Sequence, residues 1–200
     1  MDEKRVRFLT RAFIMMFASV SVAMAAGADC GSLSGLKLPH TTITLSQSVV
    51  PGAFTQPPER FAMTNGTYDK LPAFCRVAGV LKPTADSNIR FEVWMPAENW
   101  NQKFEGIGNG GFAGYLPFPD LGSQLALNYA VAGTDTGHVG GDASWAPGHP
   151  DKTIDFAIHE TAVAAKAIIK AFYGEAPKYS YFSSCSNEGR QALMEAQRYP

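Results

Sequence analysis

The sequence predicts an α/β fold in which a sheet begins with an antiparallel hairpin and continues with parallel strands. Two runs of alternating side chains, residues 76–82 and 89–95, flank a turn-prone segment, as is typical of a hairpin. Three shorter apolar runs follow at residues 104–108, 129–133 and 179–183. Their connections are long enough for parallel crossovers. A helical pattern between the last two runs supports the same fold class.

The amino end is typical of a secretory signal peptide. Basic residues precede an apolar run at 12–18, and small residues follow it. The tripeptide at 23–25 fits a cleavage site, so residues 1–25 are predicted to be removed on export. The run is short for a membrane span, and a single-span anchor is the alternative. The mature protein is therefore expected to be secreted or periplasmic, with no membrane association after cleavage.

The next segment, residues 26–74, holds several Pro, Gly, Ser and Thr residues and lacks strong periodicity. It is predicted to form an extended arm. The chain has three cysteines, Cys30, Cys75 and Cys185. Because thiols in an oxidising compartment tend to pair, a disulfide between Cys30 and Cys75 is predicted to tie the arm to the hairpin. Cys185 is then left without a partner in this chain.

A glycine-rich tract follows the run at 104–108. The segment from Gly106 to Gly111 fits G-x-G-x-x-G after a strand, and Asp135 follows at a suitable distance for a dinucleotide-binding fold. Against that alternative, Pro117 and Pro119 should break the helix that would receive the pyrophosphate. A dinucleotide-binding module is therefore the less favoured interpretation.

One long helix is predicted after the glycine-rich tract. Its apolar face consists of residues at helical spacing: Ile158, Ala162, Ala165, Ile169 and Phe172. Gly174 follows and favours a helix end there. With 17 Lys and Arg against 18 Asp and Glu, the charge is nearly balanced, and nothing indicates nucleic acid as a partner. No histidines show zinc-ligand spacing, so neither a metal nor a cofactor is predicted in this chain.

Ser186 is the first candidate for a catalytic residue. The aromatic run at 179–183, a tight turn with the serine and a following helix have the layout of the nucleophile elbow of an α/β-hydrolase. Such an elbow directs the next backbone N–H, here that of Asn187, at a developing oxyanion. A glycine-rich loop after the third strand supplies the other N–H, predicted from Gly110 or Gly111. An ordinary strand-to-helix turn and an ordinary tight turn are the alternatives.

Longer stretches resemble the tannase and feruloyl esterase family. The resemblance rests on four blocks: Cys185-Ser186-x-x-Gly189-Arg190-Gln191 with its continuation to Pro200, Phe74-Cys75-Arg76-Val77, Asn99-Trp100-Asn101 with the glycine-rich tract, and Thr134-Asp135-Thr136-Gly137-His138. It implies an α/β-hydrolase-type sheet, N-terminal part only, with residues 75–200 as a partial domain ending just after the elbow. Members usually have glycine where this chain has Ser184 and Glu188.

The resemblance also implies an activity, that of a serine carboxylesterase acting on gallate or hydroxycinnamate esters through Ser186. It implies that the triad Asp and His follow residue 200, and that Cys185 is disulfide-bonded to a cysteine beside that histidine. Calcium, often bound in the lid of relatives, would also lie beyond this sequence. Asp135 and His138 are accordingly predicted to hold loops or cap a turn.

Two alternatives to a serine esterase stay open. The main one is a non-catalytic exported binding or remnant protein, in which Ser184 and Glu188 mark a site that no longer does chemistry. The other gives the nucleophilic role to Cys185, because a thiolate is intrinsically more reactive than a hydroxyl and a helix N-terminus lowers a thiol pKa.

Overall fold

The computed structural model describes residues 27–59, 67–112, 114–144, 154–183 and 185–200, so the predicted signal peptide and Ser184 lie outside the described residues. Its elements along the chain are η1 (Cys30–Gly35), β1 (Thr41–Val49), β2 (Phe74–Leu81), β3 (Ile89–Pro96), β4 (Lys103–Ile107), α1 (Phe118–Leu125), β5 (Ala130–Thr134), α2 (Ile154–Tyr173), β6 (Tyr179–Ser183) and α3 (Asn187–Arg198).

The described strands form one mixed sheet in the order β1-β2-β3-β5-β4-β6. β2 and β3 pair antiparallel, which confirms the predicted hairpin. β4 pairs in parallel with both β5 and β6, which confirms the predicted parallel strands. Because Ile107 pairs with Ser183, the carboxyl ends of β4 and β6 lie side by side. The glycine-rich tract and the predicted elbow therefore start from neighbouring points.

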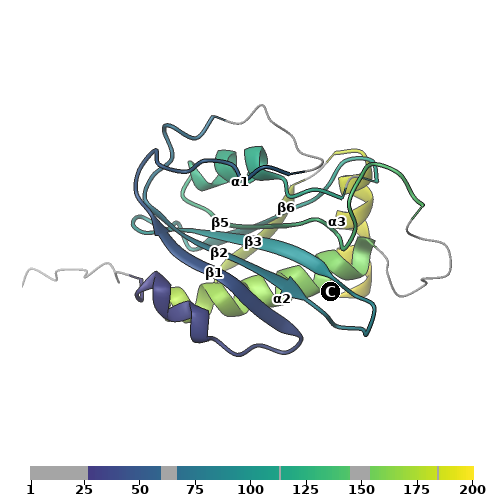
Figure 1. The fold of residues 1–200 in the computed structure, drawn as a ribbon, viewed down its shortest axis with the longest axis horizontal. Coiled ribbons are helices and arrows are strands. Elements are labelled where there is room, and N and C mark those ends of the chain that lie inside the picture. Colours follow the sequence, from purple (N-terminus) through teal and green to yellow (C-terminus); the bar gives the residue numbers. More distant parts are fainter. Residues whose placement is uncertain (1–26, 60–66, 113, 145–153, 184) are drawn as a thin grey trace, which may run out of the picture.

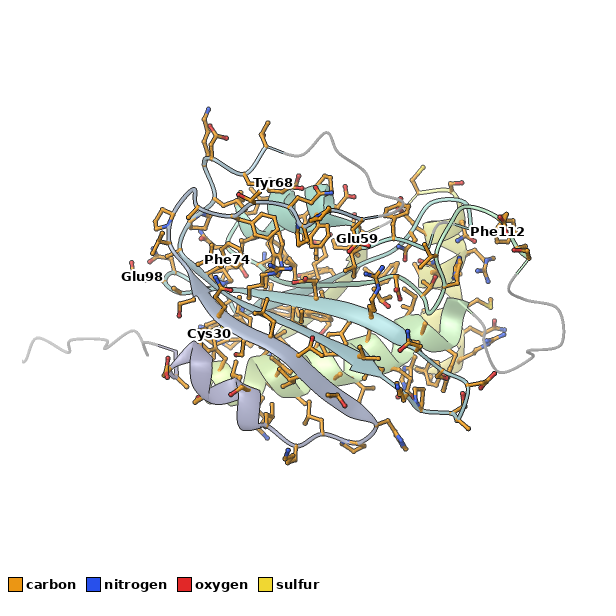
Figure 2. The ribbon with its side chains drawn as sticks, viewed as in Figure 1. Cys30, Glu59, Tyr68, Phe74, Glu98 and Phe112 are labelled. Carbon is orange, nitrogen blue, oxygen red and sulfur yellow. A yellow bond between two sulfur atoms is a disulfide. The ribbon has the colours of Figure 1, made fainter. Side chains whose placement is uncertain are left out.

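Helices cover both faces of the sheet, α1 on one side and α2 on the other (Figure 1). Two buried clusters fill these layers. Phe74 and the partly buried Tyr68 belong to the α1 side (Figure 2). Alternation along the strands produces this division, because successive strand side chains point to opposite faces. The strands that lead to the candidate site are therefore packed on both faces by buried side chains.

Helix α2 buries the face that the sequence predicted. Ile158, Ala165, Ile169 and Phe172 are buried, and Ala162 is partly buried against the same cluster. Gly174 has a φ of 79°, and its N–H donates to the Lys170 carbonyl at 2.9 Å, which ends the helix. The prediction of this helix and its end is confirmed.

The prediction of an extended arm missed one strand. Residues 41–49 form β1, which pairs antiparallel with β2 at the edge of the sheet. Most of its side chains stay half-exposed or exposed, and a register shift lies between Ile43 and Leu45. An edge strand of Thr, Ser and Gln with an irregularity shows little hydrophobic alternation, which is why periodicity did not reveal it.

Helix α1 was also not predicted. Pro117 is its N-cap and Pro119 stands in its first turn. Prolines are tolerated there because the first N–H groups of a helix have no intrahelical partner. The prediction that the two prolines break any helix was therefore wrong for residues 118–125.

The predicted disulfide between Cys30 and Cys75 is present and buried, joining η1 to β2 across a sequence separation of 45. Closing such a loop reduces the conformational freedom of the unfolded chain. Replacing both cysteines with alanine is expected to lower the free energy of unfolding by about 3 kcal/mol. Urea titration of the oxidised protein measures this. Ser48→Ala, at an exposed side chain of β1, is the control and should leave the midpoint unchanged. An unchanged midpoint in the double variant would contradict the prediction.

Candidate active site

Ser186 stands at the junction of β6 and α3 in an unusual backbone conformation. Its φ is 58° and its ψ −127°, a region that residues other than glycine rarely adopt. The turn is held by hydrogen bonds from the Glu188 N–H to the Cys185 carbonyl at 3.1 Å and from the Gly189 N–H to the Ser186 carbonyl at 3.0 Å. Serine is a preferred N-cap residue, yet this side chain makes no capping hydrogen bond. The exposed hydroxyl is thus not used to cap α3.

Asn187 is the first residue of α3. A backbone N–H at this position has no intrahelical acceptor and lies at the positive end of the helix dipole. Its side chain is fixed on both sides. Nδ2 donates to the Asn109 carbonyl at 3.2 Å, and Oδ1 accepts from Arg190 Nε at 2.9 Å. The Asn187 amide group therefore joins α3 to the glycine-rich tract. The oxyanion role of its N–H stays a prediction.

The glycine-rich tract leaves the carboxyl end of β4 directly beneath α3. A Cβ on Gly108 would stand 2.9 Å from Glu188 Cβ and 2.5 Å from Gln191 Oε1, so only glycine fits there. Gly111 has a φ of 61° and open space around it. Phe112, which follows, lies at the end of the molecule where α3 stands (Figure 2). The tract and the elbow are therefore packed against each other.

The two predicted glycine donors differ in their surroundings. The Gly110 N–H donates to the hydroxyl of buried Tyr115. Burial raises the pKa of Tyr115, and this hydrogen bond works in the opposite direction. An oxyanion at Gly110 would compete with the tyrosine for the N–H. Both assignments stay predictions. For Gly111 no hydrogen bond to Tyr115 would have to be broken.

Two buried amide side chains, missed from the sequence, fix the tract in place. Asn109 and Gln191 are 1% and 0% exposed. The Asn109 N–H donates to Gln191 Oε1 at 3.2 Å, while Asn109 Nδ2 donates to the Tyr115 carbonyl at 2.7 Å and the Thr134 carbonyl at 3.0 Å. Asn109 thereby connects the glycine-rich tract to α3 and β5. A polar residue in a loop gives no periodic signal, so only the fold reveals this role.

Asn109→Asp tests this connection. The carboxylate would replace the Nδ2 donor with an acceptor facing two carbonyl oxygens. We expect the free energy of unfolding to fall by about 3 kcal/mol, because buried groups would lose their hydrogen bonds. Asn99→Asp, at an exposed site with a positive φ, makes the same chemical change and should alter stability by less than about 0.5 kcal/mol. Equal urea midpoints for the two variants would contradict the assignment.

Asp135 and His138 hold the surrounding loops, as predicted. The Asp135 carboxylate accepts from Arg90 Nε at 2.6 Å, from the Arg90 N–H at 2.9 Å and from the Gly137 N–H at 2.9 Å. Burial raises the pKa of Asp135, and the Arg90 hydrogen bond opposes that shift. His138 Nε2 donates to the Phe112 carbonyl at 2.5 Å. Both side chains thus tie the turn after β5 to neighbouring backbone.

Cys185 is exposed and is not disulfide-bonded within the described residues. Its N–H donates to Glu188 Oε2 at 3.3 Å. The pairing of Cys185 with a cysteine after residue 200, implied by the family resemblance, stays a prediction.

A cavity of about 230 Å³ lies between the sheet and the helices α2 and α3. Phe104, Ile158 and Ala192 are among its lining residues, whereas Ser186 and the glycine donors are not. It therefore lies under the elbow helix, on the side of the sheet that carries α2, and is distinct from the surface around the serine.

The described residues give no support to the alternative site types. No helix starts at the glycine-rich tract, because α1 begins only at Phe118, so a pyrophosphate would lack a helix N-terminus there. In the described ranges no group of three or more His, Cys, Asp or Glu side chains is arranged to hold a metal ion. Nor does any described helix have the length and apolar character needed to cross a membrane.

The mixed sheet, with its parallel strands and the strand–turn–helix junction at Ser186, defines an α/β-hydrolase-type N-terminal part. A family model described as "Tannase and feruloyl esterase" matches residues 75–200. The chain belongs to the tannase and feruloyl esterase family, which confirms the resemblance found in the sequence.

Individual relatives agree with this membership. An uncharacterised esterase of Xanthomonas campestris pv. campestris is 45% identical and covers 98% of this chain and 34% of its own length. A probable feruloyl esterase B-2 of Neosartorya fischeri is 33% identical, and the match covers 86% of this chain and 34% of the relative. The crystal structure of an esterase from Aspergillus oryzae superposes with a TM-score of 0.75 at 30% identity. The superposition covers 86% of this chain and 35% of that esterase. The chain spans about a third of the length of these relatives.

Proposed function

We propose that this chain supplies the nucleophile-bearing part of an exported serine carboxylesterase that acts on gallate or hydroxycinnamate esters. The single observation that carries the proposal is the backbone of Ser186, with its φ of 58° at the start of α3, beside the glycine-rich tract that follows β4. Nucleophile elbows use such a strained turn to present a serine above a sheet. The names of the relatives, esterase and feruloyl esterase, support the reaction class and the aromatic acyl group.

The proposed reaction proceeds through an acyl-enzyme. Ser186 Oγ forms a bond to the ester carbonyl carbon, and the carbonyl electron pair moves to oxygen. The serine proton passes to an imidazole base, which the family resemblance assigns to residues after 200. The N–H groups of Asn187 and of Gly110 or Gly111 donate to the oxyanion. The alcohol then leaves with a proton from the imidazolium, and water releases the acid by the reverse sequence.

The complete reading frame that contains these residues should be expressed and assayed with methyl ferulate, methyl gallate and an aliphatic methyl ester. The proposal expects release of ferulate or gallate at a higher kcat/KM than release of the aliphatic acid. Binding of methyl ferulate without turnover would favour the non-catalytic alternative. Export is tested by sequencing the amino end of protein recovered from periplasm or medium, which should start close to Ala26.

A further inference from the structure

The side chain of Glu188 turns back from the first turn of α3 toward the elbow. Its Oε2 accepts the Cys185 N–H at 3.3 Å. A Cβ added to Gly110 would lie 3.9 Å from Glu188 Oε1, and one added to Gly108 would lie 2.9 Å from Glu188 Cγ. The carboxylate therefore lies between the turn that carries Ser186 and the glycine-rich tract. Gly110, one of the predicted oxyanion donors, borders this space.

Glu188 also brings a negative charge to that space. Its charge contributes to raising the pKa of Tyr115, although burial is the larger cause. A carboxylate in the first turn of a helix is stabilised by the helix dipole and by unpaired N–H groups. An oxyanion on the Ser186 adduct would depend on the same end of α3. The two negative groups would therefore compete for one favourable electrostatic environment.

We propose that Glu188 restrains acyl transfer at Ser186 by opposing the oxyanion of the tetrahedral intermediate. This inference rests on the proposed function. Substrate binding places no new negative charge at the carbonyl, whereas attack by Ser186 does, so the carboxylate raises the barrier more than it weakens binding. Repulsion between the Glu188 carboxylate and a nearby oxyanion in a partly solvated site corresponds to about a tenfold change in rate.

The test uses the complete protein and the variant Glu188→Gln, which removes the charge and keeps a side-chain oxygen for the Cys185 N–H. With methyl ferulate, kcat should rise about tenfold while KM changes little. Phenylboronic acid is a second probe. Its boron bonds to Ser186 Oγ as the serine proton moves to the base, giving a tetrahedral anion that mimics the intermediate. Its inhibition constant should fall by a similar factor.

Glu175→Gln is the matched control, because it makes the same change in net charge at an exposed residue beyond α2. It should alter neither kcat nor boronate affinity. Glu188→Gly removes the whole side chain and should also raise kcat, as Glu188→Gln does. Melting temperatures of all variants separate a change in charge from a change in folding.

The outcomes distinguish the two hypotheses. If Ser186→Ala abolishes hydrolysis but Glu188→Gln leaves kcat and boronate affinity unchanged or lowers them, the restraint by Glu188 is overturned and the esterase proposal stands. If neither the unmodified protein nor Glu188→Gln hydrolyses an aromatic ester or binds the boronate, both hypotheses fail. If only Glu188→Gln is active, both are supported.

Discussion

Arg76→Met is expected to lower the free energy of unfolding by about 3–5 kcal/mol, the usual result of removing one partner of a buried ion pair. Glu92 is 2% exposed, and it accepts from Arg76 Nε at 2.9 Å and Nη2 at 2.5 Å. Trp94 Nε1 donates to the same carboxylate at 2.9 Å. Without the guanidinium, the carboxylate would keep the indole N–H but lose its neutralising charge.

The packing of Arg76 adds to this effect. Its guanidinium carbon lies 5.2 Å from the centre of the Phe54 ring, in the cluster on the α1 side of the sheet. Methionine fills a similar volume, so the loss should come mainly from the unpaired charge. The double variant Arg76→Met with Glu92→Met removes both charges and should recover most of the stability.

Urea unfolding measures this series, with Lys82→Met as the control for loss of a positive charge at an exposed site. The control should change stability by less than about 0.5 kcal/mol. A loss below about 1 kcal/mol in Arg76→Met would mean that the pair behaves like a surface ion pair. A double variant less stable than Arg76→Met would contradict the unpaired-charge explanation.

Ser186→Ala is expected to lower kcat for methyl ferulate by about 10⁴-fold or more in the complete protein, as loss of a serine nucleophile does in hydrolases. The hydroxyl is not used as a helix cap, so the stability of the fold should change little. Residual activity would come from the oxyanion donors and from substrate binding.

Ser183→Ala is the control for this change. Ser183 ends β6 three residues before the elbow, is exposed, and pairs through its backbone with Ile107. It should keep kcat within about twofold, since surface substitutions away from special contacts are usually neutral. A Ser186→Ala variant that retains more than a tenth of the activity would exclude Ser186 as the nucleophile.

Local patterns were enough to predict the central elements of the fold. The hairpin follows from alternation in β2 and β3, and α2 follows from apolar residues at helical spacing. The strand–turn–helix junction at Ser186 follows from an aromatic run, a turn and a helical pattern in succession. These features are predictable because each depends on residues that are close in the sequence.

Other features depended on contacts between distant segments and could not be predicted. β1 becomes a strand through pairing with β2, although its own residues show little periodicity. Asn109 meets Gln191 across 82 positions of sequence. The place of the Glu188 carboxylate, between the elbow and the glycine-rich tract, also requires β4 and β6 to be neighbours.

The most direct test of the central claim is to trap the acyl-enzyme. The complete protein is mixed with an activated feruloyl ester and quenched in acid, and its peptides are sequenced by mass spectrometry. The serine-elbow hypothesis predicts one feruloyl group, attached to Ser186 and absent from Ser186→Ala. A feruloyl group on the neighbouring Cys185, or turnover with no adduct on Ser186 under any quench time, would contradict it.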